Sequence, residues 1–113
     1  MAVIAGNWKM YHGPRETRAF FAGLQLPPNA GAHELLVFPP SLSLSAAAGC
    51  PERDPRIQLG VQNIHWEEKG AFTGEVSAGM AKEVGAAFAL VGHSERRQLF
   101  GDSDESVARK ARA

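Results

Sequence analysis

Four short apolar runs recur along the chain, and their spacing constrains the fold more than any other feature. They cover residues 2–5, 35–38, 57–61 and 88–91 and are partly β-branched. Successive runs are separated by the length of a strand plus a crossover helix. Each run is nearly continuous and does not alternate with polar residues, which is typical of parallel strands covered on both faces. The sequence therefore predicts an α/β fold of β-α-β-α-β-α-β order, with a parallel sheet and right-handed crossovers.

Helix signals lie between these runs. Pro14 can occupy the first turn of one helix, where its missing N–H costs nothing. Ser41 can cap a second helix, which would end at Gly49. A third helix is expected over residues 77–84, because Gly85 follows as a stop signal. These positions fill each gap between neighbouring strands with one helix.

A further helix start follows the fourth apolar run. Asp102 has Glu105 three residues later, which is the pattern of an N-cap followed by a capping-box acid. The helix then continues to Ala113 without a stop signal and without a fifth strand. We therefore expect residues 1–113 to be a single, incomplete domain.

Composition restricts the partners and the compartment. The 12 basic and 12 acidic residues cancel, and no basic block is present, so neither nucleic acid nor a membrane surface is favoured as a partner. No apolar stretch approaches the roughly 20 residues that span a bilayer, and the N-terminal residues lack the pattern of a secretory signal. Cys50 is the only cysteine and cannot form an internal disulfide. A cytoplasmic protein is the expectation.

Polar motifs directly follow the first and fourth apolar runs. Residues 6–9 read Gly-Asn-Trp-Lys, and residues 92–97 read Gly-His-Ser-Glu-Arg-Arg. In parallel α/β folds, sites are built at the carboxyl ends of the strands. Lys9 and His93 are therefore predicted to share one rim of the sheet. A third motif, Gly-Ala-Phe-Thr-Gly-Glu at residues 70–75, lies in a connection of about a dozen residues.

With these three motifs in this order, the chain resembles the triosephosphate isomerase family over its whole length. The resemblance implies a TIM (β/α)8 barrel, usually of about 250 residues, of which only the first four βα units are present as a half-barrel. It implies the interconversion of dihydroxyacetone phosphate and glyceraldehyde 3-phosphate through an enediolate, in glycolysis and gluconeogenesis, without a cofactor or metal. In the family, the glutamate that abstracts the substrate proton, the flexible lid and most phosphate-binding amides lie in the other half. The 113-residue chain alone is therefore expected to be inactive.

The resemblance also implies roles for individual residues. Lys9 would place a positive charge beside the phosphate and the developing oxyanion, and Asn7 would bind the substrate at the same rim. His93 would be a neutral hydrogen-bond donor at a helix start, which is a known property of this family, and Ser94 would support it. Glu95 would pair with Lys9 or help to move protons. Taken without the motifs, a lysine or histidine after a strand is more often solvated or structural.

The motif at residues 70–75 implies a partner. In the family this arm inserts into a second subunit, so a homodimer with Phe72 and Thr73 in the contact is implied for the full-length form. A surface hairpin turned by glycines is the alternative. The function has an alternative as well: a non-catalytic half-barrel that self-associates or binds a complementary C-terminal half, because its outer strands would leave open sheet edges.

The remaining titratable residues are predicted to be structural. Arg96 and Arg97 would form salt bridges around the site, with a solvated face as the alternative. Cys50 has no histidine near it in sequence and is interpreted as a structural or surface thiol. Three histidines stand alone, without the spacing of a zinc motif, and are predicted to lie on the surface or in loops: His12, His33 and His65.

Overall fold

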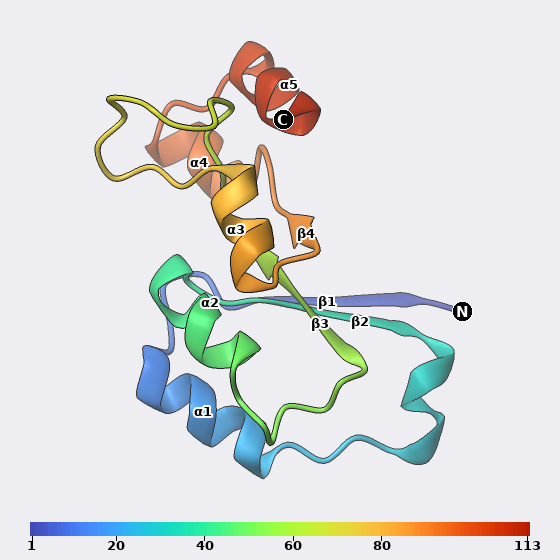
Figure 1. Cartoon of the computed structure of the whole chain (residues 1–113). Coiled ribbons are helices and arrows are strands. Elements are labelled where there is room, and N and C mark those ends of the chain that lie inside the picture. Colours follow the sequence, from blue (N-terminus) through green and yellow to red (C-terminus); the bar gives the residue numbers. More distant parts are fainter.

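In a computed structural model that describes all 113 residues, the four strands form a parallel half-barrel in the order β1-β2-β3-β4 (Figure 1). The strands are β1 (Val3–Asn7), β2 (Glu34–Phe38), β3 (Ile57–Val61) and β4 (Phe88–Ala89). The connections contain the helices α1 (Pro14–Gly23), α2 (Ser41–Ala48) and α3 (Ala78–Val84), and a short 3-10 helix, η1 (Pro28–Ala32). Two helices follow β4, namely α4 (Ser94–Leu99) and α5 (Asp104–Arg112). The predicted fold class, strand order and strand direction are confirmed.

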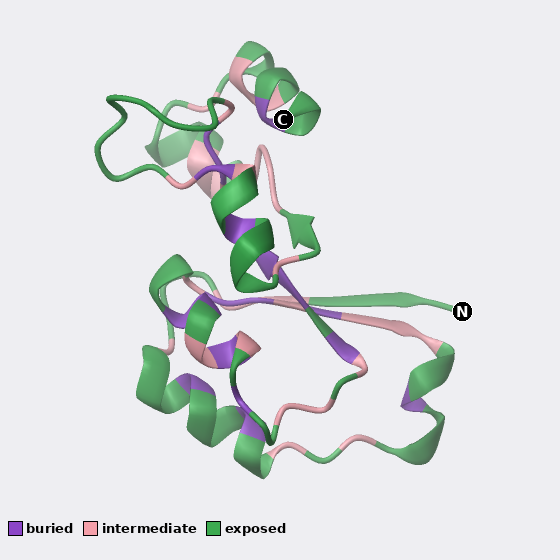
Figure 2. Ribbon diagram, viewed as in Figure 1, coloured by how far each residue is buried: buried purple, intermediate pink, exposed green.

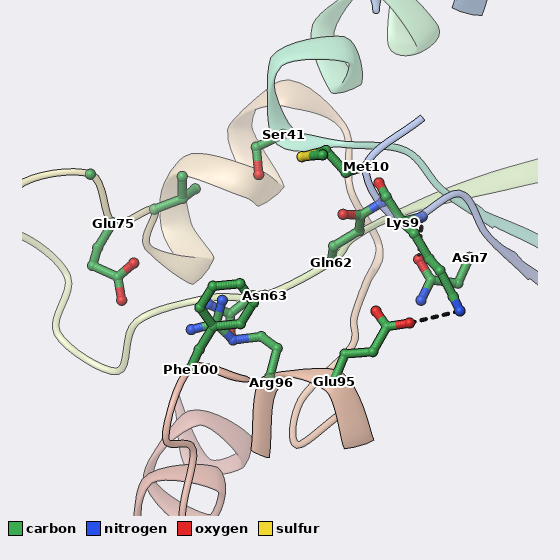
Figure 3. Close-up of a pocket in the computed structure, with 12 residues that line it drawn as sticks. Asn7, Lys9, Met10, Ser41, Gln62, Asn63, Glu75, Glu95, Arg96 and Phe100 are labelled. Carbon is green, nitrogen blue, oxygen red and sulfur yellow. Dashed lines mark hydrogen bonds and ion pairs between the residues drawn. The ribbon is translucent and has the colours of Figure 1, made fainter. Parts of the chain in front are cut away.

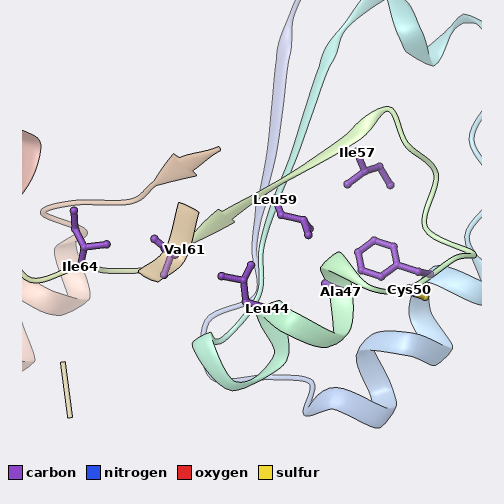
Figure 4. Close-up of a cluster of buried hydrophobic side chains, with 9 residues drawn as sticks. Leu44, Ala47, Cys50, Ile57, Leu59, Val61 and Ile64 are labelled. Carbon is purple, nitrogen blue, oxygen red and sulfur yellow. The ribbon is translucent and has the colours of Figure 1, made fainter. Parts of the chain in front are cut away.

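The core lies between α1, α2 and β3 (Figure 4). In Figure 1, α1 and α2 lie together on one side of β1, β2 and β3, while α4 and α5 lie beyond the far end of β3. Cys50 is buried in this core and its thiol donates to a Glu52 carboxylate oxygen at 3.3 Å, so the thiol is structural. Most other core members come from α1, α2 and β3: Phe21, Leu44, Ala47, Ile57, Leu59 and Val61.

The two outer strands are more exposed than their sequences predict. Val3 and Ile4 of β1 are 58% and 55% exposed, and both residues of β4 are exposed (Figure 2). The prediction that all four strands are covered on both faces is therefore wrong for β1 and β4, because both lie at the edges of the sheet and neither packs extensively against a helix. β4 is also shorter than the expected residues 88–91, although the Leu90 amide still donates to the Val61 carbonyl at 2.9 Å.

Helix boundaries follow most of the local signals. Pro14 is the first residue of α1, and Gly85 ends α3 with a backbone φ of 123°. The Ser77 hydroxyl caps α3 by accepting the Met80 amide at 3.1 Å. Ser41 was the wrong cap for α2: the N-cap position is Pro40, and no side chain caps this helix. The preceding prolines hold the chain extended there, so Ser41 already lies inside the first turn.

Asp102 does not cap α5 as predicted. The N-cap is Ser103, whose hydroxyl accepts the Ser106 amide at 3.2 Å while the Ser106 hydroxyl accepts the Ser103 amide at 2.9 Å. The Asp102 carboxylate instead binds Arg96 and Lys110. Two cations compete successfully with the backbone for this carboxylate. No helix of the structure has the length and apolar character needed to cross a membrane.

Gly60 leaves the space that the Phe38 ring fills between β2 and β3. A Cβ at position 60 would lie 2.2 Å from Cε1 and 2.4 Å from Cδ1 of Phe38, which is itself 4% exposed. We expect Gly60→Ala to lower the free energy of unfolding by about 1–3 kcal/mol, as overpacking does, in urea denaturation followed by circular dichroism. Gly23→Ala is the control, because nothing lies within 4 Å of a Cβ there. A similar loss in both variants would contradict the close contact.

Candidate active site

A polar pocket of about 310 Å³ opens at the carboxyl ends of the strands (Figure 3). The end of β1, the segment after β3 and the start of α4 each contribute side chains to it. These side chains are Asn7, Lys9, Gln62, Asn63, Glu95 and Arg96. The strand ends thus bring together residues that are far apart in sequence, as the parallel topology requires.

Lys9 projects into this pocket from a strained backbone position. Its φ of 54° lies in the left-handed region, which non-glycine residues rarely adopt. The Asn7 side-chain oxygen accepts the Lys9 amide N–H at 2.9 Å. The Gln62 side-chain amide donates to the Lys9 carbonyl at 2.7 Å. Two side chains therefore hold the strained residue from both sides.

An ion pair fixes the Lys9 charge at the rim. Its Nζ lies 2.7 Å from Oε1 of Glu95, as the resemblance implies, and both side chains are about half exposed (Figure 3). The hydrogen bond with Glu95, helped by its charge, raises the pKa of Lys9. The same hydrogen bond lowers the pKa of Glu95 against a smaller opposing effect of burial. An exposed pair of this kind contributes little to stability, so its main effect is to position two charges.

His93 is the N-cap residue of α4, and its ring is held in a defined orientation. Its Nδ1 accepts the Glu95 amide N–H at 3.1 Å. In the neutral ring the proton therefore sits on Nε2, which is left free to donate to a ligand. Glu95 contacts Lys9 and also lies 3.9 Å from Nδ1 of His93, so Lys9 and His93 share one rim as predicted. Ser94 is exposed and its hydroxyl makes no hydrogen bond, so its supporting role stays a prediction.

The two arginines after Glu95 form the predicted salt bridges. Arg96 Nε lies 3.2 Å from Asp102 Oδ2, and its guanidinium covers the Phe100 ring at 4.9 Å. Arg97 Nη1 lies 2.7 Å from Asp104. These pairs connect α4 to the start of α5 and so brace the helix that carries the site.

The arm at residues 70–75 lies in a loop whose base is closed by a bridge between His65 and Ser77. Phe72 is 43% exposed and Thr73 is exposed, so their role in a subunit contact stays a prediction. Of the two locations predicted for His65, on the surface or in a loop, the structure shows the loop: it lies at the base of the arm but is only 8% exposed, with its ring 4.2 Å from that of Phe72 and 4.3 Å from that of Trp66. The rings of Trp66 and Phe72 pack against it and bury it. Only Trp66 is next to His65 in the sequence, so the contact with Phe72 could not be predicted from it.

The other two isolated histidines lie in loops as expected. His12 Nδ1 is 3.3 Å from Glu16, and His33 Nδ1 accepts the Ala2 amide at 3.0 Å. No group of three or more histidine, cysteine, aspartate or glutamate side chains in the structure could hold a metal ion.

Comparison with known proteins decides the family. The family model described as triosephosphate isomerase matches residues 2–113. The chain belongs to this family. A curated triosephosphate isomerase of Natranaerobius thermophilus is 49% identical over 97% of the chain and 43% of its own length. Those of Solibacter usitatus and Trichodesmium erythraeum are 44% and 43% identical, over 45% and 46% of their lengths. The chain thus spans less than half the length of these triosephosphate isomerases.

Gln62 is one of two residues of this rim, with Asn63, that the sequence motifs did not indicate. It directly follows β3, just as the Lys9 and His93 motifs follow β1 and β4. The same strand-end rule could therefore have found it. The signal was weaker, because glutamine carries no charge and no motif surrounds it.

Proposed function

We propose that this chain supplies the lysine and histidine side of a triosephosphate isomerase active site, which interconverts dihydroxyacetone phosphate and glyceraldehyde 3-phosphate. The observation that carries the proposal is the rim itself. A lysine ammonium held by Glu95 and a histidine with its Nε2 free lie together at the strand ends. Membership of the family supports the substrate class.

The chemistry of the reaction explains why these groups are needed. Removing a proton from the carbon next to a carbonyl leaves negative charge on oxygen, and fixed donors stabilise that charge. Lys9 would supply the positive charge and His93 the Nε2–H donor, while Asn7 keeps Lys9 in place and contacts the substrate. No cofactor enters this scheme.

The carbon base would come from outside these 113 residues. Glu95 is the carboxylate nearest to Lys9, but that pairing lowers its pKa and makes it a weaker base. The proposal therefore includes a complementary C-terminal half. It also includes a homodimer formed through the arm with Phe72 and Thr73, and a location in the cytoplasm.

Complementation tests this function. The chain is mixed with a separately expressed C-terminal part of the Natranaerobius relative, which supplies the length that the chain does not cover. We expect the mixture to isomerise triose phosphates in a coupled assay and the chain alone to remain at the buffer rate. His93→Gln should lower the turnover of the mixture by about 10²–10⁴-fold, the usual range for a lost acid–base group.

His33→Gln is the matched control, since His33 lies in a loop and its side chain makes one hydrogen bond, from the Ala2 amide. Its turnover should equal that of the unchanged mixture. A complex that forms on size-exclusion chromatography but shows no turnover would overturn the proposal. Robust turnover that survives His93→Gln would also overturn it, because the histidine would then have no role.

The exposed edge of the sheet favours a second candidate function, a non-catalytic unit that self-associates. Val3 and Ile4 of β1 are more than half exposed, and an open parallel edge invites pairing with another chain. The chromatography step of the same experiment separates the two functions. Large assemblies of the chain that persist when the C-terminal part is added favour the second function, and their replacement by an active complex favours the first.

A further inference from the structure

A buried lysine contacts the pocket residue Asn63 and lies outside the group of residues assigned above. Lys110 of α5 is only 3% exposed. Its Nζ donates to Oδ1 of Asn63 at 2.9 Å and to Oδ2 of Asp102 at 3.0 Å. A buried ammonium is costly unless it is paired and hydrogen-bonded, and these contacts give it a carboxylate partner and two hydrogen bonds. Burial tends to raise the pKa of Asp102, but the hydrogen bonds from Lys110 and Arg96 outweigh it and lower that pKa.

The first contact of Lys110 leads to the backbone of Lys9. Asn63 directly follows Gln62 in the segment that leaves β3. The Gln62 side chain donates to the Lys9 carbonyl at 2.7 Å and to the Phe38 carbonyl at 2.8 Å. Holding Asn63 therefore also holds the side chain that supports the strained Lys9 residue.

The second contact leads to the ammonium group of Lys9. Asp102 Oδ2 accepts from Lys110 and from Arg96 Nε. Arg96 directly follows Glu95, whose carboxylate lies 2.7 Å from the Lys9 ammonium. Lys110 is thus linked to Lys9 by two routes. One passes through Asn63 and Gln62 to the Lys9 carbonyl, and the other passes through Asp102, Arg96 and Glu95 to the Lys9 ammonium.

We propose that Lys110 is a positioning residue of the site, because its buried ammonium fixes the segment after β3 and the start of α4 relative to each other. The consequence is one fixed location for the Lys9 charge at the rim. The inference rests on the proposed function only in assuming that the isomerase reaction uses the Lys9 charge. The arrangement itself is measurable in the chain without any substrate. A lysine that merely stabilised α5 would leave the Lys9–Glu95 pair unchanged.

The titration of Glu95 reports on that pair and tests the inference. In Lys110→Met the apolar stem is kept and the ammonium is lost. We expect carbon NMR of the glutamate carboxyl groups to show the pKa of Glu95 rising toward the ordinary value of about 4.3, because a released α4 loosens its contact with Lys9. His93 is the other titratable group facing Glu95, and its imidazole signals are followed in the same titration.

Arg112→Met is the matched control, since it removes an exposed cation without an ion pair from the same helix. It should leave the pKa of Glu95 unchanged. Asn63→Ala is the second variant: it breaks the link to β3 while keeping every charge, and should shift the pKa of Glu95 in the same direction by a smaller amount. If Lys110→Met does not fold, Asn63→Ala decides alone.

An unchanged pKa of Glu95 in Asn63→Ala and in folded Lys110→Met would overturn the inference. An equal rise in Arg112→Met would do so too, because the effect would then be one of general charge. Failure of the proposed function would appear in the complementation assay instead and would leave this titration as it is.

Discussion

Replacing Phe21 with alanine is expected to lower the free energy of unfolding by about 3–5 kcal/mol, the usual cost of deleting a buried aromatic ring. Phe21 is 1% exposed and extends from α1 into the core shared with α2 and β3. Its ring also stacks on that of Trp8 at 5.7 Å between centroids. The helix and the sheet are both fixed by other contacts, so they cannot collapse fully into the cavity. Since domains are typically stable by only about 5–15 kcal/mol, this one change should place much of the chain near its unfolding threshold.

Urea denaturation followed by circular dichroism measures this loss, and Phe20→Ala is the control. Phe20 is the adjacent residue of the same helix and packs edge-on against Trp8 at 4.9 Å, but it is 37% exposed. We expect a clearly smaller loss from Phe20→Ala, because its ring already contacts water. Equal losses in the two variants would mean that the core does not lie on the Phe21 side of α1.

The sequence predicted the topology well, because strand type and order depend on local patterns. The run at residues 57–61 forms β3 with the expected bounds, and β3 is the strand at the centre of the core. Burial was predicted less well, because it depends on neighbours. Val3 and Ile4 have the composition of a covered strand, yet β1 pairs only with β2. No property of residues 2–5 alone reveals a missing neighbour.

The same difference between local patterns and long-range contacts applies to the candidate site. Lys9, His93 and Glu95 were identified because each belongs to a contiguous motif after a strand. The supporting contacts were not, since Gln62 is 53 residues from Lys9 in sequence and Lys110 is 47 residues from Asn63. Only the folded sheet brings these pairs together. Asp102 was even placed in a wrong role, because an acid with Glu105 three residues later has the pattern of a helix cap.

Gly92 sets the start of α4, and Gly92→Ala should have the second-largest effect on stability. Its φ of 68° lies in the left-handed region, where an alanine costs about 1–2 kcal/mol. A Cβ there would also lie 2.9 Å from both methyl carbons of Val107 and 3.2 Å from Arg97 Nη2. Overpacking adds about 1–3 kcal/mol. We therefore expect a total loss of about 2–5 kcal/mol in urea denaturation, with a change in the NMR signal of the Glu95 amide that donates to His93.

Gly101→Ala separates the two causes of that loss. Its φ of 77° imposes the same backbone strain, but nothing lies within 4 Å of a Cβ at that position. This control should lose only about 1–2 kcal/mol and should leave the Glu95 amide signal in place. The excess loss in Gly92→Ala then measures the contact between the segment before His93 and Val107 of α5. If the free energy of unfolding fell by the same amount in the two glycine variants, the contact between α5 and the segment that carries His93 would not contribute to stability. The position of the imidazole would then depend only on the hydrogen bond from the Glu95 amide.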